Sequence, residues 1–316
     1  MKPTIALIGG FLGAGKTTLI LAAAELIQQR GANVAVVLND QGDDLVDTQL
    51  VHEHCVQADQ VSGGCFCCRF PDLIEALDRM DCCHPEVIFA EAVGSCTDIV
   101  ATTLRPLLRD YPDRFRIAPL TVVLHPDAPF TDPNLQFLYA NQVAEADVTI
   151  GRTNVTPEGV AKWLDLILAG AHAVAEHSLT LDYARYAEAE ASLAWLNARV
   201  TAIANPAISP ALLVGPLLDR LSAAVPNIVH LKLIVQCDSG YLKAALTASH
   251  TEPAVEGDLD ASPARDHEIL INVRALTSPE ELRAVIEREF AALPASLTWE
   301  HVQCFRPAAP VPYHKA

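Results

Sequence analysis

The chain has 316 residues, 51% of them hydrophobic, and a formal net charge of −17 at pH 7. Its length predicts two domains, and its hydrophobic content excludes a disordered protein. Nucleic acids and anionic membranes select for basic surfaces, so the acidic balance argues against both as main partners. The sequence has no run of about 18 apolar residues that would predict a transmembrane helix, and its start does not read as a signal peptide. We therefore expect a cytoplasmic protein whose nine cysteines are thiols or metal ligands rather than disulfides.

The first half of the chain alternates short apolar runs with helical patterns. Strands are predicted at 5–8, 34–38, 87–90, 120–124 and 148–150, and helices at 19–29, 71–80, 97–110 and 134–145. Strands that are apolar throughout and alternate with helices indicate a parallel sheet covered on both faces. Ligands of such α/β sheets bind at the carboxyl ends of the strands, so the loops after the strands are expected to carry function.

The loop after the first strand matches the phosphate-binding P-loop pattern, because four residues separate Gly10 from Gly15-Lys16-Thr17. The backbone N–H groups of such a loop surround a polyphosphate, and the helix that follows adds the positive end of its dipole. In this pattern the lysine reaches the outer phosphates and the threonine hydroxyl holds Mg²⁺. We therefore expect a nucleoside triphosphate bound by Gly10, Gly13, Ala14, Gly15, Lys16, Thr17 and Thr18.

Two later loops supply carboxylates. The segment 39–47 contains four aspartates and is predicted to be a switch that senses the γ-phosphate and Mg²⁺, with Asp40 and Asp47 facing the nucleotide. An ordinary acidic connection is the alternative. Glu91 ends the third strand and is expected to face Mg²⁺, while the N–H of Gly94 is placed to reach the γ-phosphate. The predicted catalytic set is Lys16, Thr17 and Glu91.

Between these two loops lies the segment 63–68, which reads Gly-Gly-Cys-Phe-Cys-Cys. The thiolates of Cys65, Cys67 and Cys68 can converge on one thiophilic ion such as Zn²⁺, and the preceding glycines allow the tight turn. Three ligands leave one coordination position open, which a protein that transfers the ion needs. The alternative is that these are ordinary small buried residues.

Other cysteines and histidines are weaker candidates. His52 and His54 are predicted on one side of an extended segment with Cys55, either as extra metal ligands or as solvent-facing residues. Cys82 and Cys83 follow the predicted helix 71–80, which separates them from the first cysteine motif by about 15 Å. They are interpreted as buried thiols. Cys96, two residues after the glycine of the Glu91 loop, is interpreted as a packing residue.

The pattern changes after residue 155. The first domain is placed at 1–155, a helical and acidic connector at 156–190, and an α+β domain at 191–316. Strands are predicted at 193–203, 228–236, 267–275 and 298–304, helices at 209–224 and 279–293, and a polar insertion at 239–265. Two β-α-β units of this kind suggest a ferredoxin-like layer. The proline-rich tail from residue 305 is expected to run extended over the surface.

These motifs resemble the CobW-like P-loop GTPases, relatives of the nickel-inserting accessory proteins of urease and hydrogenase. The resemblance rests on the P-loop, the Asn39-to-Gly42 segment with Asp47, the cysteine motif, the Glu91-to-Gly94 segment, and Gln142 with Ala146-Asp147. It implies nucleotide hydrolysis coupled to delivery of a metal or cofactor to a client metalloenzyme or corrinoid protein. The cargo would be zinc, cobalt, iron or nickel, and a homodimer is possible.

Three features depart from the family pattern. Asp40 and Gln41 replace the usual Glu and Phe, and the histidine-rich insertion is missing, with only His250 and His267 in that region. The family's base-reading Asn-Lys-x-Asp is replaced by the segment 151–154, in which Arg152 and Asn154 are expected to face the base. Since charge-assisted bonds to guanine are lost, either GTP or ATP could be the bound nucleotide.

Two interpretations of the function follow. The first is a Mg²⁺-dependent nucleoside triphosphatase that hands over a metal or cofactor, with a low intrinsic rate because no internal arginine finger is evident. The second is a non-catalytic module in which nucleotide and metal set a conformation that a partner reads. A small-molecule kinase is disfavoured, because it would leave the cysteine motif unexplained.

Overall fold

The computed structural model describes residues 2–43, 45–54, 56–126, 128, 130–247 and 253–314. The chain forms two compact units, which are described separately. The first consists of Met1–Gln41, Asp47–Glu190 and Ala309–Ala316, and the second of Gly42–Val46 and Ala191–Ala308. Three residues of the predicted segments, Asp44, Cys55 and His250, lie outside the described residues. No helix in the described part of the chain is both long and apolar enough to cross a membrane.

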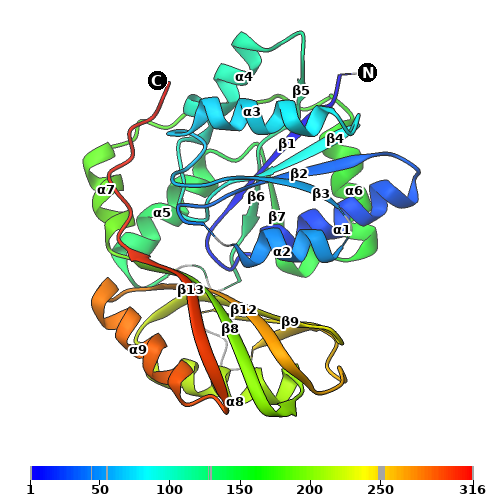
Figure 1. Ribbon diagram of the computed structural model, residues 1–316. Coiled ribbons are helices and arrows are strands. Elements are labelled where there is room, and N and C mark those ends of the chain that lie inside the picture. The colour runs from blue at the N-terminus through cyan, green and yellow to red at the C-terminus, as the bar shows by residue number, and fades with distance from the viewer. Residues whose placement is uncertain are drawn as a thin grey trace. The chain divides into compact units, whose positions relative to one another are not determined.

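The first unit is built on a parallel sheet with the strand order β3-β2-β4-β1-β6-β7, and β5 pairs with β1. The helices α1 and α3 lie on opposite sides of this sheet (Figure 1). This confirms the predicted α/β fold. The strands are β1 (Thr4–Gly10), β2 (Val34–Asn39), β3 (Gln57–Val61), β4 (Val87–Glu91), β5 (Arg116–Ile117), β6 (Thr121–Leu124) and β7 (Val148–Gly151), and the first helices are α1 (Lys16–Gln29), α2 (Val46–Glu53) and α3 (Phe70–Asp81).

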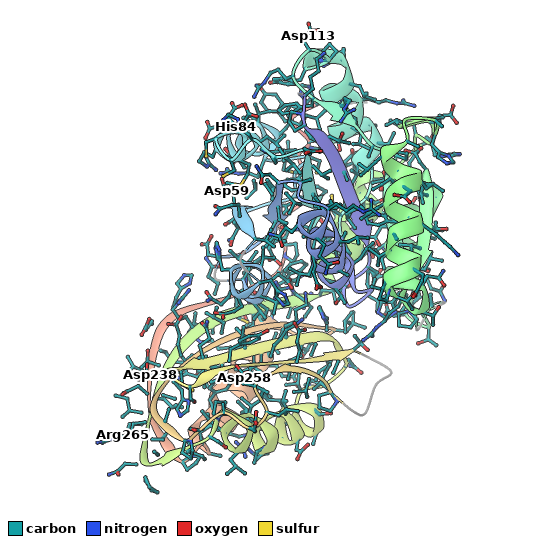
Figure 2. The ribbon with its side chains drawn as sticks, turned by 90° about the vertical axis from the view of Figure 1, so that its right-hand side faces the viewer. Asp59, His84, Asp113, Asp238, Asp258 and Arg265 are labelled. Carbon is teal, nitrogen blue, oxygen red and sulfur yellow. The ribbon has the colours of Figure 1, made fainter. Side chains whose placement is uncertain are left out.

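The helix α2 and the strand β3 were not predicted. In α2, Val46, Leu50 and Val51 are buried at helical spacing, although only a short apolar stripe marks the segment. His52 therefore lies on a helix, and the predicted extended segment is wrong. Only one residue of β3 is buried, because it is the edge strand of the sheet. Asp59 lies on this strand (Figure 2), and its carboxylate forms an ion pair with Arg79 of α3 at 2.6 Å.

The predicted helix 97–110 begins later than expected. It consists of a π-helical turn, Val100–Leu104, followed by α4 (Arg105–Asp110). Pro106 lacks the N–H that would continue the α-helical ladder, which is consistent with a change of hydrogen-bond pattern at this point. The segment 92–98 remains a loop. The other helices of the unit are α5 (Pro133–Ala144), α6 (Pro157–Leu168) and α7 (Tyr183–Ala191), with no helix or strand between the last two.

The second unit contains an antiparallel sheet with the order β11-β10-β9-β12-β8-β13. Strand β12 lies between β8 and β9, so the units β8-α8-β9 and β12-α9-β13 interleave as in a split β-α-β fold. Alternate residues of these strands pack with the two helices into one core. The elements are β8 (Ala194–Ile208), α8 (Pro210–Ala224), β9 (Ile228–Cys237), β10 (Gly240–Thr247), β11 (Ala254–Gly257), β12 (Ala264–Ala275), α9 (Pro279–Ala291) and β13 (Ala295–Phe305).

The polar segment 239–265, expected to be an insertion, extends this sheet with β10 and β11. The turn into β10 is fixed by Gly240, whose φ of 137° suits glycine, and by a 3.2 Å hydrogen bond from the Tyr241 N–H to Asp258 (Figure 2). The tail after β13 has no helix or strand in residues 306–312, as expected. Its last residues belong to the first unit, where the Tyr313 N–H donates to the carbonyl of Cys67 in the cysteine motif, at 2.7 Å.

Candidate nucleotide and metal site

The P-loop connects β1 to α1 in a conformation that requires glycine. Gly10 has a φ of 134°, and a Cβ there would lie 2.6 Å from the carbonyl oxygen of Val123. Gly15, with a φ of 101°, precedes the first residue of α1, whose first turn holds no acidic side chain. The buried ammonium of Lys16 donates to the Gly10 carbonyl at 3.0 Å, which folds the side chain back over the loop. The positive end of α1 and the Lys16 ammonium are therefore on the same loop, as phosphate binding requires.

Three oxygen-bearing side chains meet next to this loop. The Thr17 hydroxyl lies 3.0 Å from the Asp47 carboxylate and 3.2 Å from the Glu91 carboxylate. The Lys16 ammonium is 3.8 Å from Glu91, which is buried at the end of β4. A hydroxyl and two carboxylates are hard oxygen donors of the kind that Mg²⁺ prefers. The residues present therefore fit Mg²⁺, with α1, α2 and β4 each supplying one of them.

Asn39, at the end of β2, connects this region to the cysteine motif. Its buried side-chain amide donates to the carbonyls of Val61, at 2.9 Å, and Gly64, at 2.7 Å. Its side-chain oxygen accepts from the Phe66 N–H at 2.8 Å. Asn39 was expected only as the first residue of the switch segment 39–47, and its contacts with the cysteine motif were not predicted. The predicted residue Asp40 follows it, with its N–H bonded to the Val61 carbonyl at 3.2 Å.

The cysteine motif forms a tight turn with converging sulfurs. Gly63 and Gly64 both have positive φ, at 76° and 151°, which confirms the expected role of these glycines. The Sγ of Cys68 lies 3.5 Å from that of Cys65 and 3.6 Å from that of Cys67. Tetrahedral Zn²⁺ with Zn–S bonds of about 2.3 Å would separate its sulfur ligands by about 3.8 Å. The sulfurs of the motif, all within 4.8 Å of one another, therefore fit a thiophilic ion with little rearrangement.

Cys96 is a further buried cysteine, on the loop that follows β4. Its Sγ lies 3.8 Å from the Thr97 carbonyl, and the influence of the Cys65 and Cys67 thiols lowers the pKa of Cys96 to about 6. Hydrogen bonds with Cys65, and then with Cys68 and Cys96, raise the pKa of Cys67 well above its ordinary value. The loop that carries Cys96 is held by Gln142, whose amide donates to the carbonyls of Gly94 at 2.9 Å and Cys96 at 3.0 Å. Cys96 is 1% exposed, which agrees with its interpretation as a packing residue.

Two buried glutamates support the same loop. Ser95 donates to Glu190 at 2.5 Å, and burial raises the pKa of Glu190 to about 7. Glu145 accepts from the Thr97 hydroxyl at 3.2 Å and from the Val100 N–H at 3.1 Å. Burial raises the pKa of Glu145 to about 8. Neither residue was singled out from the sequence, because an acidic residue in a helical pattern usually faces solvent.

The raised pKa of Glu145 gives a prediction for stability. The folded state holds the proton more tightly than the unfolded state, so the free energy of unfolding should fall as the pH rises from about 4.5 to about 8. Glu145→Gln resembles the protonated carboxyl and should be more stable than the wild type at pH 8 by about 4 kcal/mol, but not at about pH 4.5. Urea unfolding at both pH values measures the difference, with the exposed Glu25→Gln as the control. Equal pH slopes for the wild type and Glu145→Gln would contradict it.

The remaining candidates lie apart from these sites. Arg152 and Asn154 are exposed on a short 3₁₀ turn directly after β7. Cys82 is exposed and Cys83 half-buried at the far end of α3, so the prediction of buried thiols is wrong. The end of the helix leaves their side chains at the surface. In the part of the chain that the structure describes, His52, His54, Cys82 and Cys83 do not join any group of three close metal-ligating side chains.

The first unit is similar in sequence to a known family of domains. Residues 4–154 match the family described as the CobW/HypB/UreG nucleotide-binding domain. The zinc chaperone YjiA of Escherichia coli (strain K12) is 36% identical over 103 residues, which cover 31% of this chain and 31% of that protein. The sequence match thus spans about a third of the curated relative.

Two solved structures are more distant. The Zn(II)-bound YjiA GTPase from E. coli is 15% identical with a TM-score of 0.35, covering 91% of this chain and 99% of that chain. HypB from Helicobacter pylori in complex with nickel is 15% identical with a TM-score of 0.38, covering 57% of this chain and 92% of that chain.

Proposed function

We propose that this chain, whose residues 4–154 match the CobW/HypB/UreG nucleotide-binding domain, is a Mg²⁺-dependent nucleoside triphosphatase that controls the transfer of a thiophilic metal ion. The P-loop with Lys16 would hold the triphosphate, and Thr17, Asp47 and Glu91 would hold Mg²⁺. When bound, Mg²⁺ would neutralise charge on the β- and γ-phosphates. The cysteine motif would carry the transferred ion, which is the cargo rather than a resident cofactor.

The observation that carries this proposal is the placement of Asn39. It ends β2 and is the first residue of the predicted switch segment 39–47, and it makes three hydrogen bonds to residues in and just before the cysteine motif. A change in the switch segment on binding the γ-phosphate would therefore act directly on the loop that presents the thiolates. Nucleotide state and metal affinity would be coupled through this side chain.

The cargo and client are proposed by chemistry and similarity. Three thiolates suit Zn²⁺, Co²⁺, Fe²⁺ or Ni²⁺, and the similarity to the zinc chaperone YjiA makes Zn²⁺ the first ion to test. The client would be a metalloenzyme or a corrinoid protein that accepts the ion at the open coordination position.

Phosphate release measured with and without Mg²⁺ and Zn²⁺, together with Zn²⁺ transfer to a chelator, tests the proposal. We expect slow Mg²⁺-dependent hydrolysis and a transfer rate that differs between the GTP-bound and GDP-bound protein. A matched variant, Asn39→Ala, should keep the P-loop but make the transfer rate insensitive to nucleotide. Absence of hydrolysis with nucleotide-dependent transfer would favour the second candidate, a non-catalytic module that only binds nucleotide and metal.

The protein should distinguish only weakly between GTP and ATP. Arg152 and Asn154 stand where the family has a lysine and an aspartate that pair with guanine, and both are exposed. A lost charge-assisted contact is worth about 1.5–3 kcal/mol, so the preference for GTP over ATP should be less than about a hundredfold. Competition binding of GTP and ATP to the Mg²⁺-loaded protein measures this ratio. A preference of several thousandfold for GTP would contradict the prediction.

A further inference from the structure

The segment 309–314 lies against the cysteine motif. It follows β13 in the chain, and it belongs to the first unit, as the motif does. The Tyr313 N–H donates to the carbonyl of Cys67 at 2.7 Å. Cys67 is 2% exposed, whereas the neighbouring Cys68 is half-buried. The segment is therefore bonded to the backbone of the motif directly next to its more exposed cysteine.

Aromatic rings hold the same segment to the start of α3. The Tyr313 ring stacks on Phe70, with 6.2 Å between the ring centroids and 16° between the ring planes. The His314 ring meets Phe70 edge-on, with 4.6 Å between the centroids. Phe70 is 2% exposed and Tyr313 is 61% exposed, so the tyrosine is an outer layer over a buried ring. Because Cys67 and Phe70 flank Cys68 in sequence, these two anchors place the segment beside the half-buried cysteine.

The composition of the segment suits a contact that can detach. Pro310 and Pro312 have no N–H and restrict the backbone to extended conformations, which disfavours a helix or a paired strand here. One backbone hydrogen bond and one aromatic contact together favour the attached position by about 10- to 100-fold. The detached form is then about 1–10% of the molecules, which is enough for it to be visited repeatedly.

We propose that residues 309–314 form a strap that controls access to the cysteine motif, and that the ion enters and leaves while the strap is detached. This rests on the proposed function and adds the regulation of its metal site. The strap is anchored to a carbonyl and a ring rather than to a sulfur, so it should attach equally to the ion-free and the ion-loaded protein. It should therefore change how fast an ion moves and leave unchanged how tightly the ion is held.

A purely structural role of the segment leads to a different expectation. A segment that only covered Phe70 would add stability without changing the reactivity of Cys68 or the rate of ion transfer. Cys82 provides an internal reference, because it is exposed at the other end of α3. The reactivity of Cys82 reports general exposure and unfolding, whereas the reactivity of Cys68 reports the strap.

The first test labels the thiols of the ion-free protein with a maleimide and follows Cys68 and Cys82 by mass spectrometry. A chain ending at Ala308 lacks the strap, and Tyr313→Pro removes both the tyrosine ring and the N–H of the anchoring hydrogen bond. We expect Cys68 to react at least about tenfold faster in both variants, and Cys82 to react at the wild-type rate. Val311→Ala is the matched control and should react like the wild type, because Val311 is 71% exposed and both anchors are kept.

The second test measures the transfer of Zn²⁺ from the loaded protein to a chelator and the equilibrium affinity for Co²⁺. We expect both strap variants to release Zn²⁺ at least about tenfold faster than the wild type, with an unchanged Co²⁺ affinity.

The outcomes separate the strap from the metal site itself. Equal Cys68 labelling in the wild type and the variants, or faster labelling with equal Zn²⁺ release, would overturn the strap while the metal-transfer function stands. A wild type that binds neither ion would overturn the proposed function and with it the role of the strap. Circular dichroism shows whether the variants are folded, and if the chain ending at Ala308 is not, Tyr313→Pro decides.

Discussion

Lys16→Ala is expected to abolish nucleotide hydrolysis and to weaken triphosphate binding. The Lys16 ammonium is the cation that the P-loop places next to the outer phosphates, and removing one preorganised charge of this kind costs about 100-fold or more in kcat. Loss of its charge-assisted hydrogen bonds should weaken binding by about 10- to 100-fold. Phosphate release and fluorescence titration with GTP and with ATP measure the two effects.

The folded state also depends on this lysine. Lys16 is buried 3.8 Å from the buried Glu91, so its removal leaves a carboxylate without that cation, and the variant should be less stable. Thermal unfolding must therefore accompany the titrations. Lys162→Ala removes an exposed lysine from α6 and is the matched control for net charge. A folded Lys16→Ala protein with unchanged Kd values for both nucleotides would show that the P-loop is not the nucleotide site.

The features that could be predicted from the sequence are those in which one physical constraint requires one residue type. The strands β1, β2, β4 and β6 are buried at almost every position, so their apolar runs could be read directly. The P-loop and the glycines before the cysteine motif could be predicted because only glycine suits positive φ and close backbone approach. The edge strand β3 could not, because a strand with one buried residue has no apolar run to recognise.

The parts of the site that escaped prediction are contacts between segments distant in sequence. Asn39, Gln142 and Glu145 act through hydrogen bonds to loops that lie between 22 and 48 residues away along the chain. Nothing in the local spacing of these residues indicates the partner, whereas Cys65, Cys67 and Cys68 could be grouped because they are sequence neighbours.

Replacing Cys65, Cys67 and Cys68 together with serine should eliminate binding of one equivalent of Zn²⁺ or Co²⁺. Serine keeps the approximate shape but supplies a hard, largely protonated oxygen that thiophilic ions bind poorly. The P-loop is untouched, so nucleotide affinity in the absence of metal should stay within about threefold of the wild type, a difference of well under about 1 kcal/mol. Titration with Co²⁺ and metal analysis of the purified protein measure the loss. The double variant Cys82→Ser and Cys83→Ser is the matched control, because it removes adjacent thiols at the other end of α3.

The same Co²⁺ titration tests whether nucleotide binding and metal binding are coupled. Asn39 joins the end of β2 to the cysteine motif, and Glu91 on the neighbouring strand β4 contacts Thr17 of the P-loop, so triphosphate binding should change Co²⁺ affinity by at least about fivefold. Linkage then requires metal to change triphosphate affinity by the same factor, and the triple serine variant should lose this effect. Equal Co²⁺ affinities of the nucleotide-free and triphosphate-bound wild type would leave a metal site and a nucleotide site on one domain without communication. In that case delivery of the ion could not be timed by hydrolysis, because the two states of the protein would hold it equally well.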